Sequence, residues 1–106
     1  MFSLFGKKNY KSVSAAELTP SKGKLNLIDI REKGEYKGGH IPGAKNIPMA
    51  ELLGQPEKYL NKETEYHIVC HSGKRSRRAS ETLSKLGYKI VNVMDGTMSY
   101  PYKLQK

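Results

Sequence analysis

The fold of this chain is decided by residues 66–86, which read YHIVCHSGKRSRRASETLSKL. The apolar run that leads to Cys70 predicts a short buried strand ending at the cysteine. A polar turn follows, and Ser76 is expected to open a helix that stops at Gly87. The apolar side chains of this helix recur at helical spacing, at Ala79, Leu83 and Leu86. A strand, a turn and a helix in this order are typical of a parallel α/β sheet.

Cys70 is the only cysteine of the chain, and it stands where the predicted strand meets the turn. A lone cysteine at the end of an apolar strand is often just a small buried hydrophobe. Here, however, the thiol faces free backbone N–H groups and the positive end of a helix dipole, which both favour the nucleophilic thiolate. Lys74 and Arg75 add positive charge close by. We therefore interpret Cys70 as an activated cysteine beside a cradle for an anionic group.

Length and composition limit the class of protein. The 106 residues suffice for one core, so we expect a single domain over residues 1–106 with a loose basic tail at 1–9. One cysteine permits no internal disulfide and no thiolate metal cluster, which favours the reducing cytoplasm. The apolar start at 1–6 is too short to span a bilayer, and we expect no stable membrane insertion.

The net charge of +9, from 19 Lys and Arg against 10 Asp and Glu, raises the question of a nucleic-acid partner. The lysines are scattered from Lys7 to Lys106, and the one dense basic cluster, at 74–78, surrounds the cysteine turn without interleaved aromatic residues. We therefore expect no nucleic-acid partner. The charge is expected to attract small anions or an acidic partner protein.

The remaining segments predict short strands that alternate with short helices. Ser14 and Glu17 have the spacing of a capping box at the first helix. Further strands are expected at 11–13, 25–30, 46–47 and 90–93, further helices at 15–18, 31–37, 49–53 and 57–60, and turns at 19–23 and 40–44. This alternation predicts an α/β fold with a small, mostly parallel five-stranded sheet flanked by helices. Ligands of such sheets bind beyond the carboxyl ends of the strands, where Cys70 lies.

Three stretches taken together resemble the rhodanese-like domain family. The first, within residues 27–48, contains LIDIRE, EY and GHIPGAKNIP. The second, at 69–76, reads VCHSGKRS and is similar to the family's active-site loop C-x-S-G-x-R-S. The third joins LGY at 86–88 to VMDG at 93–96. The resemblance runs from about residue 12 to residue 100, and it implies a three-layer rhodanese-like domain that carries sulfane sulfur as a cysteine persulfide.

The resemblance also implies a role for individual residues. Cys70 would be the sulfur-accepting nucleophile, and the substrate-binding loop, which Arg75 closes, would comprise His71, Ser72, Gly73, Lys74 and Arg75. Possible support for this loop comes from Asp29, Arg31 and Ser76, although Asp29 and Arg31 could instead form a structural ion pair. The sequence departs from the family at His71, where many members have Arg, at Asp95, which replaces a Gly, and at Tyr100, where Trp is common.

The expected function is a sulfurtransferase reaction through a Cys70 persulfide. Sulfur would come from thiosulfate, a polysulfide or a persulfide, and would leave to an external thiol, cyanide or a carrier protein because the chain has no second cysteine. A non-catalytic persulfide carrier or thiol sensor that acts through a partner protein is the alternative. Four residues separate Cys70 from Arg75, whereas C-x5-R phosphatases have five, so a phosphatase is disfavoured.

No metal site and no cofactor are expected. His67, His71 and Cys70 are close in sequence, but neighbours on a strand point in alternate directions and no helical His pair exists. His40 is expected to be a hydrogen-bonding turn residue.

Overall fold

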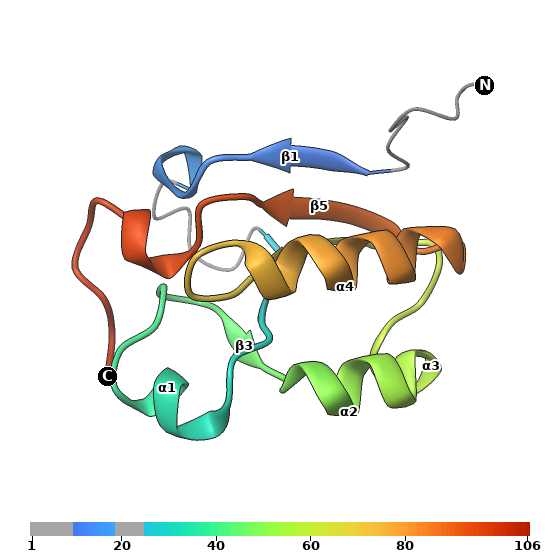
Figure 1. Cartoon of the computed structure of the whole chain (residues 1–106), viewed down its shortest axis with the longest axis horizontal. Coiled ribbons are helices and arrows are strands. Elements are labelled where there is room, and N and C mark those ends of the chain that lie inside the picture. Colours follow the sequence, from blue (N-terminus) through green and yellow to red (C-terminus); the bar gives the residue numbers. More distant parts are fainter. Residues whose placement is uncertain (1–9, 19–24) are drawn as a thin grey trace.

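The computed structural model describes residues 10–18 and 25–106, in which strands and helices alternate (Figure 1). The strands are β1 (Lys11–Val13), β2 (Leu27–Asp29), β3 (Lys45–Asn46), β4 (Glu65–Val69) and β5 (Lys89–Val93). The α-helices are α1 (Lys33–Lys37), α2 (Met49–Gly54), α3 (Pro56–Tyr59) and α4 (Lys74–Lys85), and η1 (Ala15–Glu17) and η2 (Thr97–Ser99) are single 3-10 turns. The tail predicted at 1–9 and the turn predicted at 19–23 lie outside the described residues.

The five strands form one sheet in the order β1-β5-β4-β2-β3, and every neighbouring pair is parallel. The prediction of a five-stranded α/β sheet is confirmed, and the sheet is parallel throughout. In β4 the four residues after Glu65 are buried, as are the last four of β5. Because β4 is the central strand, the residue that follows it, Cys70, stands in the middle of the edge where the strands end.

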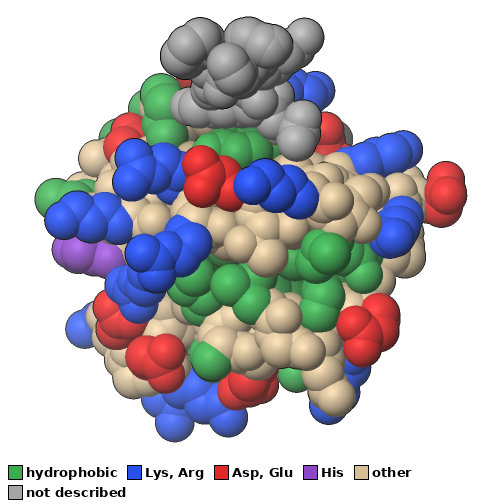
Figure 2. All heavy atoms as spheres, turned by 45° about the vertical axis from the view of Figure 1, so that its right-hand side comes forward, with side chains coloured by type: hydrophobic (Ala, Val, Ile, Leu, Met, Phe, Trp, Pro, Cys, Tyr) green, Lys and Arg blue, Asp and Glu red, His purple; other side chains and the backbone are tan. Residues whose placement is uncertain are grey.

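The two faces of the sheet are covered by different elements, so the molecule has three layers. Ile68 packs with Ala79 and Leu83 of α4 and with Leu52 of α2 in one cluster of buried residues. The next residue along β4, Val69, belongs to the opposite cluster, which also contains Ala15, Ile41, Val93 and Tyr100. This switch between faces follows the two-residue period of a strand. Charged residues lie outside both clusters, and Figure 2 shows Lys and Arg side chains around a band of hydrophobic side chains.

Two details of the predicted helix after the cysteine were wrong. The helix α4 begins at Lys74, two residues before Ser76, because Gly73 occupies its N-cap position with a φ of 105°. At the other end, Leu86 is the C-cap residue and is 48% exposed, whereas Ala79 and Leu83 are fully buried as predicted. The capping box predicted at η1 is confirmed, since the backbone N–H of Ser14 donates to Glu17.

A glycine beyond β5 is required for the cysteine turn to pack. Gly96 has a φ of 75°, and a Cβ added there would clash with the carbonyl group of His71. The amides that follow hold the same turn, since Thr97 donates to the Cys70 carbonyl at 2.9 Å and Met98 to the His71 carbonyl at 3.1 Å. The segment after β5 therefore clamps the cysteine turn through the backbone.

We expect Gly96→Ala to lower the free energy of unfolding by about 1–3 kcal/mol, because it combines a strained φ with a backbone clash. The control is Gly54→Ala in α2, where a Cβ would meet nothing within 4 Å; it should be neutral or stabilise by up to about 1 kcal/mol. Urea unfolding of both variants measures the difference. Equal stabilities of the two variants would contradict the proposed clamp.

Candidate active site

The sulfur of Cys70 is held by two backbone N–H groups. Gly73 donates to the Sγ atom at 3.2 Å, and Ser76, in the first turn of α4, donates at 3.3 Å. The side chain is 1% exposed. The chain reverses so tightly around this sulfur because Gly73 adopts a φ that other residues rarely take, with its Cα against the carbonyl group of Met94. A negative charge on the sulfur would be met by these amides and by the helix dipole.

Ser76 supports the turn in a second way. Its buried hydroxyl donates to the Gly73 carbonyl at 3.2 Å and approaches the Val93 carbonyl at 3.5 Å. The side chain therefore joins the start of α4 to the end of β5. Its backbone N–H points at the sulfur of Cys70, so one residue contributes both to the shape of the turn and to its electrostatics.

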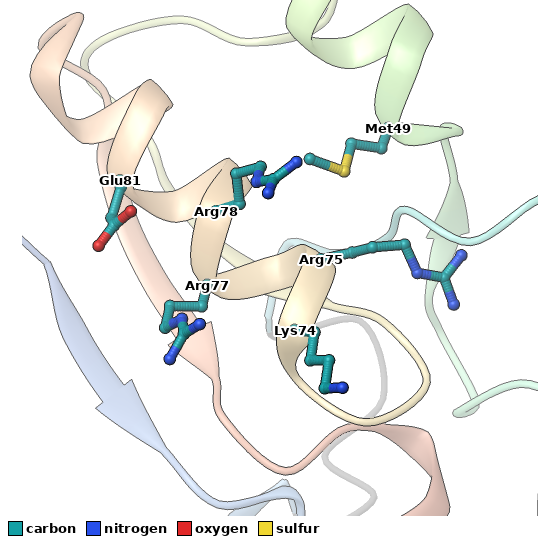
Figure 3. Close-up of a pocket in the computed structure, with 6 residues that line it drawn as sticks. All are labelled: Met49, Lys74, Arg75, Arg77, Arg78 and Glu81. Carbon is teal, nitrogen blue, oxygen red and sulfur yellow. The ribbon is translucent and has the colours of Figure 1, made fainter.

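The other residues of the predicted loop present their side chains to solvent in different directions. The side chains of His71, Ser72 and Lys74 are exposed. Figure 3 shows that Lys74 and Arg75 extend from the start of α4 in different directions, Arg75 away from the axis of the helix. Of the five predicted loop residues, Gly73 directs its amide at the sulfur of Cys70, while the cationic side chains of Lys74 and Arg75 diverge.

Arg75 is engaged in an ion pair that the sequence analysis did not foresee. Its Nη1 and Nη2 groups donate to the two carboxylate oxygens of Glu35, in α1, at 2.9 and 3.0 Å. Oε1 of Glu35 also accepts the backbone N–H of Glu32 at 2.9 Å. Hydrogen bonding from Arg75 lowers the pKa of Glu35 from its ordinary value of 4.5 to about 2, and the same contact raises the pKa of Arg75. The paired N–H donors of Arg75, the residue expected to close the substrate-binding loop, are thus directed at Glu35.

Asp29 and Arg31 form a buried structural ion pair, which was one of the two alternatives. Arg31 donates through Nε and Nη2 to the two carboxylate oxygens of Asp29, both at 2.9 Å, and its Nη2 also donates to the Gly39 carbonyl at 2.7 Å. The backbone N–H of Arg31 donates to the same carboxylate. The hydrogen bonds of the Asp29 carboxylate are therefore made with Arg31, and the pair fixes the chain between β2 and α1.

Two of the three histidines, His40 and His67, take structural positions. His40 stacks on Tyr36 with ring centroids 3.7 Å apart, and its Nδ1 lies 2.9 Å from the Tyr36 carbonyl oxygen. His67 is buried in β4, and this burial lowers its pKa. Among residues 10–18 and 25–106, no cluster of three or more His, Cys, Asp or Glu could hold a metal ion. No helix in those ranges is both long and apolar enough to cross a membrane.

Curated relatives share much of this sequence. "Putative sulfur carrier protein YrkF" of Bacillus subtilis is 40% identical over 82 residues, which are 76% of this chain and 44% of that protein. The chain therefore spans less than half the length of this relative. "Putative sulfurtransferase YtwF" of the same organism is 37% identical over 95 residues, which are 88% of this chain and 89% of that one.

The fold is found among solved structures as well. The protein SSP1007 of Staphylococcus saprophyticus superposes with a TM-score of 0.81 at 30% identity, covering 91% of this chain and 99% of that one. The family description "Rhodanese-like domain" matches residues 12–100, which include every strand described above except the first residue of β1. The chain therefore belongs to the rhodanese-like domain family, with relatives of the sulfurtransferase and sulfur-carrier kind.

Proposed function

We propose that this protein is a sulfurtransferase that moves sulfane sulfur from an anionic donor to a thiol through a persulfide on Cys70. The observation that carries the proposal is the pair of N–H groups, from Gly73 and Ser76, directed at the cysteine sulfur. A persulfide ends in an S⁻ atom, and the amides at the start of α4 favour such an anion without a proton relay. The single thiol of the chain limits the persulfide to this position.

In the first half-reaction, the Cys70 thiolate attacks the outer sulfur of thiosulfate. The new Cys70 S–S bond forms as the sulfur–sulfur bond of the donor breaks, and sulfite departs with the electron pair. The charge of −3 on the reactants equals that of the persulfide and sulfite. Polysulfides and persulfides react in the same way and release a shorter polysulfide or a thiolate. The backbone of residues 71–75 is proposed to surround the incoming sulfur.

In the second half-reaction, an acceptor thiolate attacks the outer sulfur of the persulfide. A new persulfide forms on the acceptor, and Cys70 leaves as a thiolate, so no oxidant or reductant is consumed. The acceptor comes from outside this chain, because the chain offers no second cysteine. Such chemistry suits the reducing cytoplasm, where we propose that the protein acts.

A persulfide carrier is the second candidate, supported by the name of the relative YrkF. Carrier and enzyme share the Cys70 persulfide and differ in turnover. Repeated transfer to a small thiol in excess over the protein identifies the enzyme. One transfer per loaded molecule, with no reloading from thiosulfate or polysulfide, identifies the carrier.

The side chains of the supporting residues are proposed to act on the loop and not on the sulfur. Ser76 and the Asp29–Arg31 pair fix the ends of the elements that meet at the turn. Arg75 is proposed to be a positioning residue, because its bidentate contact with Glu35 ties the start of α4 to α1. Lys74 remains exposed and contributes positive charge at the mouth of the turn.

Cys70→Ser is expected to abolish persulfide formation and to reduce sulfur transfer to the uncatalysed background, because the hydroxyl is a far weaker nucleophile than a thiolate. Intact mass after incubation with thiosulfate or polysulfide should show one added sulfur in the wild type and none in the variant. Circular dichroism checks that the variant folds. Sulfur transfer by a folded Cys70→Ser protein would remove the mechanism.

Arg75→Lys is expected to lower the rate of persulfide formation about tenfold. Lysine keeps the positive charge, but it cannot donate the two parallel N–H bonds by which Arg75 holds Glu35. If Arg75 positions the loop, the factor should be the same for thiosulfate and for a neutral organic trisulfide. Glu35→Gln should move both rates in the same direction by a smaller factor, and Glu57→Gln on exposed α3 is the matched control. A loss confined to thiosulfate would show that Arg75 recognises the sulfonate instead.

The Glu35–Arg75 pair also predicts a dependence of stability on pH. The pKa of Glu35 is depressed in the folded protein to about 2, so the pair stabilises the fold above about pH 4.5 and is lost as the pH falls towards 2. Because both side chains are more than a third exposed, the gain is about 1 kcal/mol or less. The midpoint temperature of thermal unfolding should be higher for the wild type than for Glu35→Gln at pH 6, and the two midpoints should be equal near pH 2. A difference that grows on acidification would contradict this.

A further inference from the structure

A hollow of about 470 Å³ lies beside the cysteine turn, between the first half of α4 and the start of α2 (Figure 3). Its walls are formed by Met49, Lys74, Arg75, Arg77, Arg78 and Glu81. In Figure 3 the side chains of Arg78 and Met49 point toward each other across it, while Arg77 and Lys74 extend to other sides of the same helix. Four cationic side chains and one carboxylate therefore surround a space open to solvent.

Most of this positive charge is not neutralised within the protein. Arg75 is paired with Glu35, but Lys74, Arg77 and Arg78 form no ion pair among the residues that the structure describes. All three side chains are exposed. An anionic ligand would therefore meet cations whose charges are free to interact with it.

The position of these cations on α4 is unfavourable for the helix itself. The start of a helix carries a partial positive charge and prefers acidic side chains, yet the first turn of α4 contains no acidic residue. Like charges that neighbour one another along a helix also repel. Residues that break a local rule of stability are expected where a site has a function. The charge on this end of α4 thus indicates a ligand.

The hollow lies along the helix whose first turn donates to the sulfur of Cys70. The amide of Ser76, which donates to Cys70 Sγ, lies between Arg75 and Arg77 in sequence on the same helix. Cys70 is 1% exposed, so an acceptor must bring its thiol to the mouth of the turn. A ligand held by the first two turns of α4 would be close to the point where sulfur leaves.

We propose that this hollow docks an acidic segment of the protein that accepts sulfur from Cys70, an inference that rests on the proposed function. The carboxylates of the partner would meet Lys74, Arg77 and Arg78. A protein is favoured over a nucleic acid because the wall contains a methionine and no aromatic residue for base stacking. Two further methionines at the turn, Met94 and Met98, are 52% and 63% exposed and offer apolar contact to a protein surface.

The test compares two synthetic peptides that each carry one cysteine, followed by a run of glutamates in one and of glutamines in the other. The protein is first loaded with sulfur on Cys70, and transfer to each peptide is timed. We expect kcat/KM to be about tenfold higher for the glutamate peptide at low salt, because opposite charges steer association. This advantage should shrink as the salt concentration rises.

Substitution of two cations that line the hollow tests whether the preference for the glutamate peptide arises there. The double variant Arg77→Gln with Arg78→Gln should lose the preference for the glutamate peptide and keep the wild-type rate with dithiothreitol, a small uncharged thiol. It should unfold at the same temperature as the wild type or higher, since cations near the helix start are removed. The control is Lys85→Gln, an exposed cation in the last turn of α4 that does not line the hollow; it should keep the preference.

Direct binding separates this proposal from the proposed function. A fluorescent glutamate peptide without cysteine should bind the wild type and lose at least half of its affinity in the double variant. Failure of transfer to every thiol, dithiothreitol included, would overturn the proposed function. The binding measurement would still test whether the hollow docks an acidic segment, because the peptide without cysteine needs no sulfur transfer. Three outcomes would each overturn the docking proposal. They are equal transfer rates for the two peptides, a preference for the glutamate peptide that the double variant retains, and tighter binding of an RNA oligonucleotide than of the glutamate peptide.

Discussion

Two backbone N–H groups directed at one buried sulfur are the contact on which this structure depends. A buried polar group without hydrogen bonds is unfavourable, and the turn that holds Cys70 places two donors on its sulfur. Gly73 and Ser76 do so only because β4 ends just before the cysteine and α4 begins four residues after it. The position of β4 in the middle of a parallel sheet buries the sulfur, and the start of α4 supplies the donors.

The cysteine turn is held on two sides, by close backbone contacts on one side and by one ion pair on the other. On one side, Gly73 and Gly96 let the cysteine turn and the segment after β5 approach each other, with the Cα of each against a carbonyl group of the other. On the other side, Arg75 reaches Glu35 in α1. A loop fixed at both flanks keeps its amides aligned, which is the preorganisation that electrostatic stabilisation of the proposed persulfide requires.

The local and periodic parts of this structure could be predicted from the sequence. The alternation of short apolar runs with polar helical segments predicts the parallel sheet, and the position of Cys70 follows from the order of elements. Contacts between distant segments could not be predicted in this way. Glu35 and Arg75 are 40 residues apart, and no local pattern joins them. Whether Asp29 would turn to the loop or to Arg31 depends on side-chain directions that a single sequence does not fix.

The start of α4 was misplaced for a related reason. Ser76 was expected to open the helix, but the N-cap residue is Gly73, which has no side chain to accept a helix amide. The sulfur of Cys70 acts as the capping acceptor instead, because it accepts the N–H of the third helical residue, Ser76. Cys70 therefore serves as the cap of the helix that follows it, an arrangement that arises only once the strand and the helix are brought together. The first turn of α4 contains no acidic residue, so its backbone amides are met by the sulfur of Cys70, while the carboxylate of Glu35 reaches the side chain of Arg75 from α1.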